Sequence, residues 1–125
     1  MIKILIAEDD TFLTNSYKTH VENTDDIEVD IAHDGIETIE KVNEINPSLI
    51  ILDLLMPRKG GVETLEELKN NPDTKNIPVI IATNIDDEEN KRKCQELGCV
   101  EYLIKSEISL SQLDEKIREH ALENN

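Results

Sequence analysis

Apolar residues follow two alternating patterns along the chain. The first consists of short segments rich in β-branched and apolar residues, at positions 3–7, 28–32, 49–53, 79–83 and 101–104. Three of these segments are continuous apolar runs, which is typical of parallel strands covered on both faces. In the second pattern, apolar residues recur at helical spacing in the intervening segments, as at Leu13, Tyr17 and Val21. Together the patterns predict five βα units in one doubly wound α/β sheet with right-handed crossovers.

Polar residues and a glycine mark the expected helix ends. Three residues stand three positions before a Glu or Gln, which is the spacing of a helix capping box: Asp34, Asp86 and Ser109. Gly98 directly follows an apolar residue and is typical of a helix end. The helix predicted over residues 86–97 has almost no apolar residues besides Cys94 and Leu97. We therefore expect that helix to be lightly packed and largely exposed.

Length and charge restrict the classes of function. A chain of 125 residues is large enough to bury a core without disulfides, and we expect one domain over residues 1–125. The net charge of -15, from 28 acidic and 13 basic residues, argues against direct binding to nucleic acids or anionic membranes. No apolar run reaches the roughly 20 residues of a membrane-spanning helix, so we expect a soluble, cytoplasmic protein. Cys94 and Cys99 lack partners at metal-ligand spacing, and we expect reduced thiols.

The candidate chemistry lies where the predicted strands end. Asp53 follows the most apolar run of the chain, and a carboxylate at such a place needs a cation or a chemical role to offset its burial. Further polar residues at strand ends are Glu8, Asp9, Thr83 and Lys105, with Asp10 adjacent. Parallel strands place these ends along one edge of the sheet. Several carboxylates at one edge require a compensating cation, and hard oxygen ligands favour Mg²⁺ or Mn²⁺.

The motifs around these residues carry a family resemblance. They read Ile6-Ala7-Glu8-Asp9-Asp10, Leu52-Asp53-Leu54-Leu55-Met56-Pro57 followed by Gly60-Gly61, Ile81-Ala82-Thr83-Asn84, and Glu101-Tyr102-Leu103-Ile104-Lys105. In this order, and over essentially the whole chain, they resemble the receiver domain of two-component response regulators of the chemotaxis-regulator type. The resemblance implies a flavodoxin-like fold, with a five-stranded parallel sheet of order 2-1-3-4-5 and five helices.

The resemblance also implies roles for the residues of the site. Asp53 would be the phosphoacceptor, which takes a phosphoryl group from a sensor histidine kinase or a histidine phosphotransferase. A Mg²⁺ or Mn²⁺ ion would be held by Glu8, Asp9, Asp53 and the backbone carbonyl of Leu55. Lys105 would pair with the phosphoryl group.

A further implication of the resemblance is a phosphorylation switch. The Thr83 hydroxyl would donate a hydrogen bond to the phosphoryl group, and Tyr102 would rotate into the space that Thr83 vacates. This movement would remodel the surface of the fourth helix, the fifth strand and the fifth helix for an unknown downstream protein target. The resemblance implies a monomer or weak dimer that promotes only its own phosphorylation and dephosphorylation, and is not otherwise an enzyme.

Some positions depart from the family pattern. Ser106 follows Lys105 where most receivers have a proline after a cis peptide bond. Because a cis bond without proline costs about 2.5–4 kcal/mol, we expect a trans bond and a reshaped loop. Asn84 replaces a small residue, and would either narrow access to Asp53 or donate a hydrogen bond to the phosphoryl group. Leu55 is apolar and would not orient an attacking water, so we expect slow hydrolysis of the phosphorylated form.

Other classes of function compete with this one. A receiver-like interaction module that works without phosphorylation is the main alternative, and the departures at Asn84 and Ser106 keep it open. The presence together of five site residues argues against it: Glu8, Asp9, Asp53, Thr83 and Lys105. A phosphohydrolase of the haloacid dehalogenase type would require a second acid two residues after its nucleophile, where this chain has Leu55. A flavodoxin-like flavin binder would require a phosphate-binding loop after the first strand, where this chain has acidic residues.

Overall fold

The fold is built around one parallel sheet. The computed structural model describes residues 2–22 and 26–123. The sheet has the strand order β2-β1-β3-β4-β5, and every neighbouring pair is parallel. The strands are β1 (Ile2–Ala7), β2 (Ile27–Ala32), β3 (Leu49–Leu52), β4 (Val79–Thr83) and β5 (Glu101–Ile104). The doubly wound fold and the order 2-1-3-4-5 are thereby confirmed.

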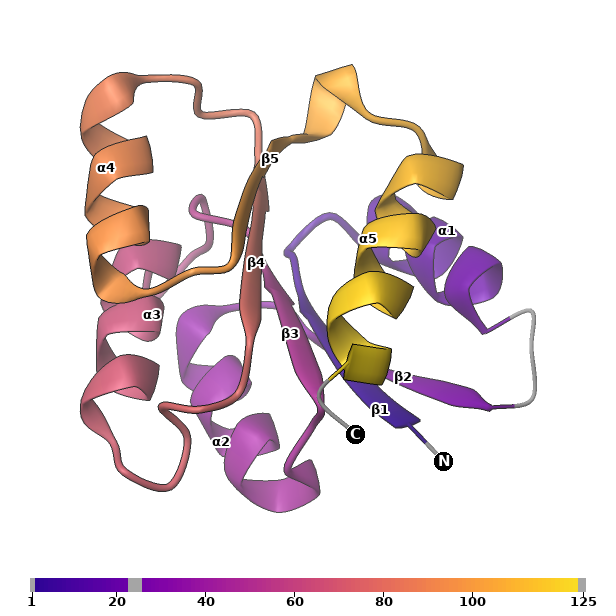
Figure 1. The fold of residues 1–125 in the computed structure, drawn as a ribbon, viewed down its shortest axis with the longest axis horizontal. Coiled ribbons are helices and arrows are strands. Elements are labelled where there is room, and N and C mark those ends of the chain that lie inside the picture. The colour runs from indigo at the N-terminus through magenta and orange to yellow at the C-terminus, as the bar shows by residue number, and fades with distance from the viewer. Residues whose placement is uncertain (1, 23–25, 124–125) are drawn as a thin grey trace.

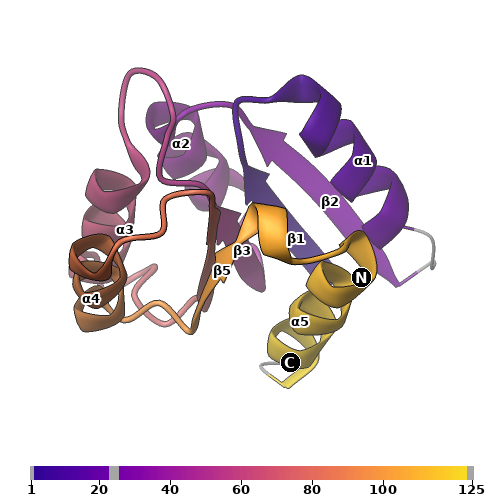
Figure 2. The ribbon, with the colours of Figure 1, turned by 90° about the horizontal axis from the view of Figure 1, so that it is seen from above.

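Helices cover both faces of the sheet (Figures 1 and 2). One face carries α1 (Thr11–Val21) and α5 (Leu110–Glu123), and the other carries α2 (Gly35–Ile45), α3 (Gly61–Asn70) and α4 (Glu88–Leu97). A short 3₁₀ helix, η1 (Lys105–Glu107), links β5 to α5. Among the described residues, no helix combines the length and the apolar character needed to cross a lipid bilayer.

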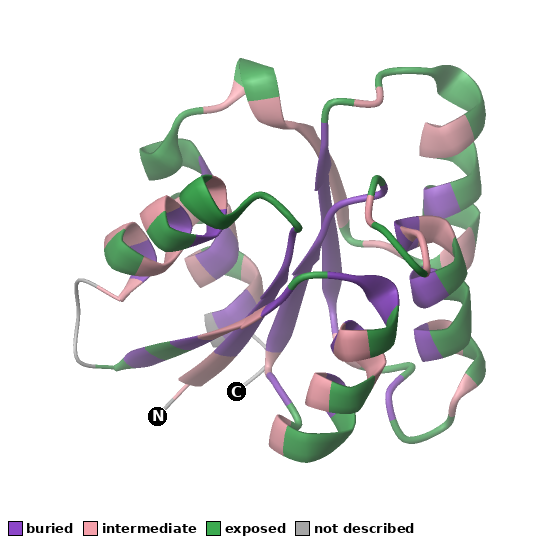
Figure 3. Ribbon diagram, turned by 180° about the vertical axis from the view of Figure 1, so that it is seen from behind, coloured by how far each residue is buried: buried purple, intermediate pink, exposed green. Residues whose placement is uncertain are grey.

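Each strand divides its side chains between two hydrophobic cores. Along β1, Ile4 and Ile6 join the core under α1 and α5, while Leu5 and Ala7 join the core under α2, α3 and α4. This division follows from the alternation of side chains along a strand. Because both faces are covered, every residue of β3 and β4 is buried (Figure 3). Burial on both faces explains why their sequences are continuous apolar runs.

The helix ends agree with the sequence in most places. Asp34 and Ser109 cap their helices as predicted, since their side chains accept hydrogen bonds from the backbone N–H groups three residues later. Gly98 ends α4 with a φ of 100°. The predicted cap at Asp86 is wrong: α4 begins after Asp87, whose Oδ1 accepts from the Asn90 N–H at 2.8 Å. Asp86 instead forms an ion pair at 2.6 Å with a lysine of that helix, Lys91.

The helix α4 is packed as lightly as its sequence predicts. Cys94 is its single buried residue. Burial raises the pKa of the Cys94 thiol to about 11, and both Cys94 and Cys99 are free thiols. Few buried apolar contacts give a segment low local stability. We therefore expect α4 to move at a smaller energetic cost than the other helices that cover the sheet.

The first turn of α3 lies directly against the end of β3. The Gly61 N–H donates to the Leu54 carbonyl at 3.0 Å. A Cβ atom at Gly61 would overlap the carbonyl oxygen of Asp53 and would lie 2.6 Å from the Leu54 Cα, whereas the nearest atom to a Cβ at Gly60 is 3.5 Å away. Glycine at position 61 therefore allows the backbone around Asp53 to lie against a helix start.

We expect Gly61→Ala to lower the free energy of unfolding by about 2 kcal/mol, since overpacking against backbone atoms forces the backbone to shift. Urea denaturation measures this change. Gly60→Ala is the matched control, because it lowers the entropy of the unfolded chain by the same amount. It should cost less than about 1 kcal/mol, the value of a helix cap. Equal costs for the two variants would contradict the proposed close contact.

Candidate functional site

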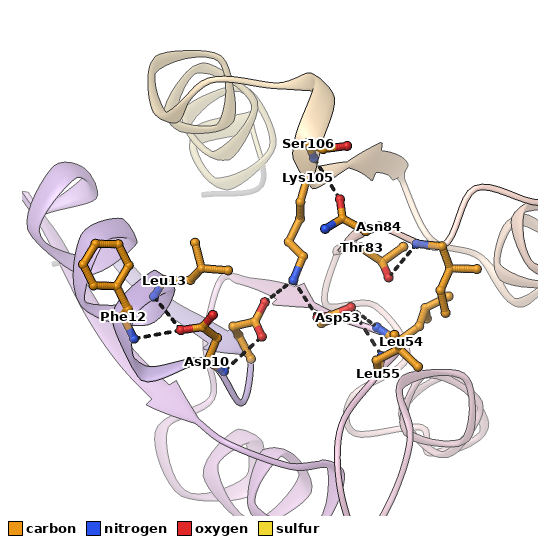
Figure 4. Close-up of polar contacts among 12 residues, drawn as sticks. Asp10, Phe12, Leu13, Asp53, Leu54, Leu55, Thr83, Asn84, Lys105 and Ser106 are labelled. Carbon is orange, nitrogen blue, oxygen red and sulfur yellow. Dashed lines mark hydrogen bonds and ion pairs between the residues drawn. The ribbon is translucent and has the colours of Figure 1, made fainter.

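Four polar side chains from four strand ends meet at one edge of the sheet. Glu8 follows β1, Asp53 follows β3, Thr83 ends β4 and Lys105 follows β5. The strands are in register there, with Ala7 paired to Leu52 and Thr83 paired to Ile104. Figure 4 shows Lys105 reaching down from η1 toward Asp53, with Thr83 on the neighbouring strand.

The Lys105 ammonium lies between two buried carboxylates. Its Nζ is 2.5 Å from Glu8 Oε1 and 2.8 Å from Asp53 Oδ2. The side chains of Glu8 and Asp53 are only 4% and 6% exposed, so water does little to stabilise their charges. Burial alone lowers the pKa of Lys105, but the hydrogen bonds to Asp53 and Glu8 outweigh it and raise that pKa above its ordinary value.

The backbone holds the second oxygen of the Asp53 carboxylate. Asp53 Oδ1 accepts hydrogen bonds from the N–H groups of Leu54 at 2.7 Å and Leu55 at 3.3 Å. The Asp53 N–H donates to the Ala7 carbonyl at 3.0 Å, which ties the residue to β1. The carboxylate is thus fixed on both sides, by backbone amides on one oxygen and by an ammonium on the other.

Glu8 is the carboxyl group that burial perturbs most clearly at this edge. Burial raises its pKa above the ordinary value of 4.5, and the negative charge of Asp53 adds to the rise. The hydrogen bonds from Lys105 and from the Asp10 N–H, which is 3.1 Å from Glu8 Oε2, oppose the rise without cancelling it. Ionisation of Glu8 therefore costs more here than in water, and additional positive charge would lower that cost.

The donor set fits a divalent cation by charge and by atom type. Glu8, Asp9 and Asp53 supply three carboxylates against the single positive charge of Lys105, which leaves a net charge that one divalent ion balances. Oxygen donors of this kind suit Mg²⁺ and Mn²⁺. Asp9 is exposed, and no hydrogen bond or ion pair joins it to another residue that the structure describes. Its carboxylate is not gathered with those of Glu8 and Asp53, since their ligand atoms do not all lie within 4.8 Å of one another.

Within the described ranges, a different group has its ligand atoms within 4.8 Å: Glu101, Glu119 and His120. This group lies between β5 and α5. Lys116 Nζ already supplies a positive charge there, at 3.2 Å from Glu101 and 3.6 Å from Glu119. The hydrogen bond with His120 and then that with Lys116 hold the pKa of Glu101 below its ordinary value. The group is thus an ion-pair network between a strand and a helix.

Thr83 and Tyr102 lie on the side of the site that faces α4. Thr83 is fully buried, and its Oγ1 accepts a hydrogen bond from the Ile85 N–H at 3.3 Å. The Tyr102 hydroxyl donates to the Ile85 carbonyl at 2.7 Å. Burial raises the pKa of Tyr102 to about 12, so the hydroxyl keeps its proton at neutral pH. Both side chains therefore contact the segment that connects β4 to α4.

The peptide bond between Lys105 and Ser106 is trans, as the sequence predicts. No described peptide bond is cis, and η1 begins at Lys105. The Ser106 N–H donates to Asn84 Oδ1 at 2.9 Å (Figure 4). The sequence left two roles open for Asn84, and neither included this contact. A hydrogen bond between residues 22 positions apart depends on the conformations of two loops, which local patterns do not reveal.

A second contact that the sequence did not reveal holds the loop after β3. Arg58 donates to Asp34 Oδ2 through Nε at 2.8 Å, and its Nη2 lies 2.7 Å from the same oxygen. Arg58 adopts a left-handed conformation with a φ of 64°, which is uncommon for a residue other than glycine. Asp34 was predicted only as a helix cap. It therefore serves α2 and also the loop that carries Leu55.

We expect the free energy of unfolding of Glu8→Gln to rise relative to that of the wild type as the pH increases. Below the ordinary pKa of 4.5 both folded and unfolded Glu8 bind the proton, so the buried carboxyl costs nothing extra. As pH rises through the raised folded pKa, the wild type must ionise a buried group. Urea denaturation at pH 4 and pH 7 with a chelator present should show a relative gain on the order of 1 kcal/mol for Gln.

The control for this prediction is Glu66→Gln, which changes an exposed acid on α3. Its stability relative to the wild type should hardly vary over the same range. A Glu8→Gln difference that shrinks or stays constant as pH rises would contradict the stated effect of burial on Glu8.

Comparison with known proteins assigns the chain to a family. The family model of the response regulator receiver domain matches residues 4–118. Among curated proteins, response regulator Rcp1 of Synechocystis is 40% identical over 91 residues, which cover 67% of this chain and 62% of Rcp1. A CpxR homolog of Haemophilus influenzae, a transcriptional regulatory protein, is 33% identical over 105 residues. The match covers 84% of this chain and 44% of that protein, so the chain spans about half of these relatives.

Solved structures agree with the sequence comparison. The receiver domain of the Francisella response regulator 1452 superposes with a TM-score of 0.89 at 30% identity, with full coverage of both chains. The Mn²⁺-bound form of Rcp1 superposes with a TM-score of 0.86 at 32% identity, over 98% of this chain and 96% of that one. Given this agreement in sequence, fold and strand order, the chain belongs to the response regulator receiver domain family of two-component signalling.

Proposed function

We propose that this chain is a phosphoryl-accepting signalling module whose acceptor is Asp53. The donor is a phosphohistidine of a sensor histidine kinase or a histidine phosphotransferase. A carboxylate oxygen of Asp53 attacks phosphorus, the P–N bond breaks, and the imidazole leaves with the electron pair of that bond. The observation that carries the proposal is the buried Asp53 carboxylate, with Lys105 Nζ at 2.8 Å and two backbone N–H groups on its other oxygen.

The residues around Asp53 supply positioning and charge, which dominate phosphoryl transfer. Lys105 pairs with the Asp53 carboxylate before transfer and is close enough to pair with the phosphoryl oxygens after it. The Leu54 and Leu55 N–H groups keep the acceptor oriented. The Thr83 hydroxyl is a donor from the adjacent strand. Asp53, Thr83 and Lys105 each end a strand or directly follow one, so the sheet fixes their spacing.

A divalent ion is part of the proposal. Glu8, Asp9, Asp53 and the backbone carbonyl of Leu55 would hold Mg²⁺ or Mn²⁺, which supplies positive charge to the transferring phosphoryl group. The net negative charge of the three carboxylates and Lys105 supports this assignment, as does the Mn²⁺-bound form of the relative Rcp1. Asp9 is exposed, so its carboxylate is free to turn toward the ion.

The proposed switch uses Thr83 and Tyr102. A phosphoryl group on Asp53 draws the Thr83 hydroxyl inward, away from its contact with the Ile85 N–H. Tyr102 then exchanges its hydrogen bond with the Ile85 carbonyl for the space behind Thr83. The light packing of α4 supports this movement, because it has a single buried residue. The remodelled surface of α4, β5 and α5 would bind a downstream protein target.

The remaining expectations are proposals of the same kind. We propose a cytoplasmic monomer or weak dimer that binds no nucleic acid and inserts into no membrane. Its only chemistry is its own phosphorylation and dephosphorylation. Some relatives join such a domain to a catalytic one, as in a protein-glutamate methylesterase/protein-glutamine glutaminase of Bacillus licheniformis, of which this chain spans 34%.

A receiver-like module that works without phosphorylation is the second candidate. The observation that favours it is the closed contact of Lys105 with both Glu8 and Asp53, while Asp9 lies outside the group. In that case the ion pairs of Lys105 with Glu8 and Asp53 would serve only to stabilise this edge of the sheet. Phosphorylation chemistry separates the two candidates.

Incubation with acetyl phosphate and Mg²⁺ should add a single phosphoryl group to the chain, as measured by intact mass. The adduct should require the metal and should be absent from Asp53→Asn, because that side chain lacks the nucleophilic carboxylate. Circular dichroism checks that the variant is folded. A folded wild type that takes no phosphoryl group would favour the module that works without phosphorylation.

Leu55→Asn should shorten the half-life of phosphorylated Asp53 several-fold. Leu55 is 64% exposed beside the acceptor, and an amide at this place can orient an attacking water that leucine cannot. The decay of the adduct, followed by intact mass after removal of the donor, measures the half-life. Leu55→Met keeps an apolar side chain and should change the half-life little. An equally stable adduct in Leu55→Asn would contradict the prediction.

A further inference from the structure

A side-chain hydrogen bond joins the loop that follows Thr83 to the loop that follows Lys105. The Ser106 N–H donates to Asn84 Oδ1 at 2.9 Å. Asn84 directly follows Thr83, and Ser106 directly follows Lys105. We call this contact the Asn84–Ser106 bridge. Figure 4 shows it directly above the site, between the start of η1 and the end of β4.

The bridge satisfies a backbone group that η1 cannot satisfy itself. The first N–H groups of any helix have no partner within the helix. In η1 the residue at the N-cap position, Ile104, provides no side-chain hydrogen bond. Asn84 supplies the missing acceptor from another loop, so it caps η1 in the way that an N-cap asparagine caps its own helix. A proline at position 106 would have no N–H to donate.

The same bond fixes the orientation of the Asn84 amide. Because the Ser106 N–H can only donate, the Asn84 oxygen must face it, and the Asn84 NH₂ group must face away. The hydrogen bond with Ser106 ties Asn84 to η1. The neighbouring residue Ile85 is tied separately, through the hydroxyl of Tyr102 at 2.7 Å. The loop after β4 is thus held at two successive residues, to η1 through Asn84 and to β5 through Ile85.

The backbone at Lys105 has little other support. The strand β5 lies at the edge of the sheet, with β4 as its one neighbour, and all four of its residues are only partly buried. Ser106 and Glu107 are exposed. Yet the long Lys105 side chain must place its Nζ within 2.5 Å of Glu8 and 2.8 Å of Asp53. A flexible side chain holds such a position only when its backbone is fixed.

We propose that Asn84 is a positioning residue for Lys105, and that it acts through the Asn84–Ser106 bridge. The bridge holds the peptide between Lys105 and Ser106, and this peptide sets the reach of the ammonium toward Asp53. The role in phosphoryl transfer rests on the proposed function, whereas the role in holding Lys105 does not. Asn84 thereby links the residue after Thr83 to the residue after Lys105, so the two groups that would contact a phosphoryl group move together.

The test of the catalytic part is a double-mutant cycle. The rate of adduct formation with acetyl phosphate and Mg²⁺ should fall roughly three- to tenfold in Asn84→Ala, the loss expected for one net hydrogen bond. In a Lys105→Ala background the same substitution should change the rate less than twofold, because Asn84 then has no ammonium to position. Asn76→Ala is the control. It removes an exposed asparagine before the opposite end of β4 and should leave the rate unchanged.

The cycle also separates the proposal from a direct role of Asn84. If the Asn84→Ala loss is equally large without Lys105, then Asn84 acts on the phosphoryl group through its own NH₂, and the proposal is overturned. An unchanged rate in Asn84→Ala with Lys105 present overturns it as well.

Amide hydrogen exchange tests the bridge without any phosphorylation. Exchange of the Ser106 N–H, followed by NMR, should become several-fold faster in Asn84→Ala. It should stay slow in Asn84→Asp, which keeps the acceptor oxygen. The Lys105 ammonium signal should also broaden in Asn84→Ala as its contacts loosen. Should the wild type take no phosphoryl group, the proposed function fails, while these two signals still decide whether Asn84 holds Lys105. Unchanged signals in Asn84→Ala would refute the bridge.

Discussion

Everything at the functional edge depends on one ammonium group between two buried carboxylates. Glu8 and Asp53 directly follow adjacent strands and are nearly excluded from water, and Lys105 approaches both from the end of the edge strand β5. Two carboxylates in such a place repel each other and lose hydration. The ammonium offsets both effects. It also links the residue after β5 with the residues after β1 and β3, two strands that β5 does not pair with.

This arrangement explains why this edge of the sheet is suited to binding a cation and a phosphoryl group. The site retains an excess of negative charge when Asp9 is included, so it favours a divalent cation. A phosphoryl group brings further negative charge, which Lys105 and the cation would share. Groups that the strand ends already orient would stabilise the transition state of phosphoryl transfer. Preorganised charge of this kind is the usual source of phosphoryl-transfer catalysis.

Much of the fold was predictable because strands that are buried on both faces have continuous apolar sequences. The continuous apolar runs of β3 and β4 gave their positions to within one residue. The site residues Glu8, Asp53, Thr83 and Lys105 followed from the same strands, since parallel strands end at one edge. The N-cap of α4 was misplaced by one position, because Asp86 and Asp87 are adjacent and chemically equivalent. Only the conformation of the loop selects Asp87.

Contacts between distant loops were not predictable. The hydrogen bond of Ser106 with Asn84 and the ion pair of Arg58 with Asp34 join residues 22 and 24 positions apart. Both depend on backbone turns that no periodic pattern encodes. The exposed position of Asp9 has the same origin, since the direction of one loop residue decides whether its carboxylate joins the group. The sequence thus located the site, while the structure was needed to find what holds it.

The segment after Thr83 connects the site to the outer surface. Asn84 is tied to η1 through Ser106, and Ile85 is tied to β5 through Tyr102. A movement of this segment must therefore strain or break its hydrogen bonds with η1 and β5. Helix α4 follows directly and has a small buried surface. The two hydrogen bonds thus join the loop between Thr83 and α4 to η1 and to β5.

The most direct measurement is an NMR titration with beryllium fluoride and Mg²⁺, since the beryllofluoride group binds a carboxylate oxygen as a phosphoryl mimic. The account predicts that the amide signals of Asp53, Thr83, Tyr102 and Lys105 shift together in the wild type and stay unchanged in Asp53→Asn. Signals that stay unchanged in the wild type, or that shift equally in both proteins, would contradict the claim that Asp53 accepts a phosphoryl group and transmits its arrival to β5.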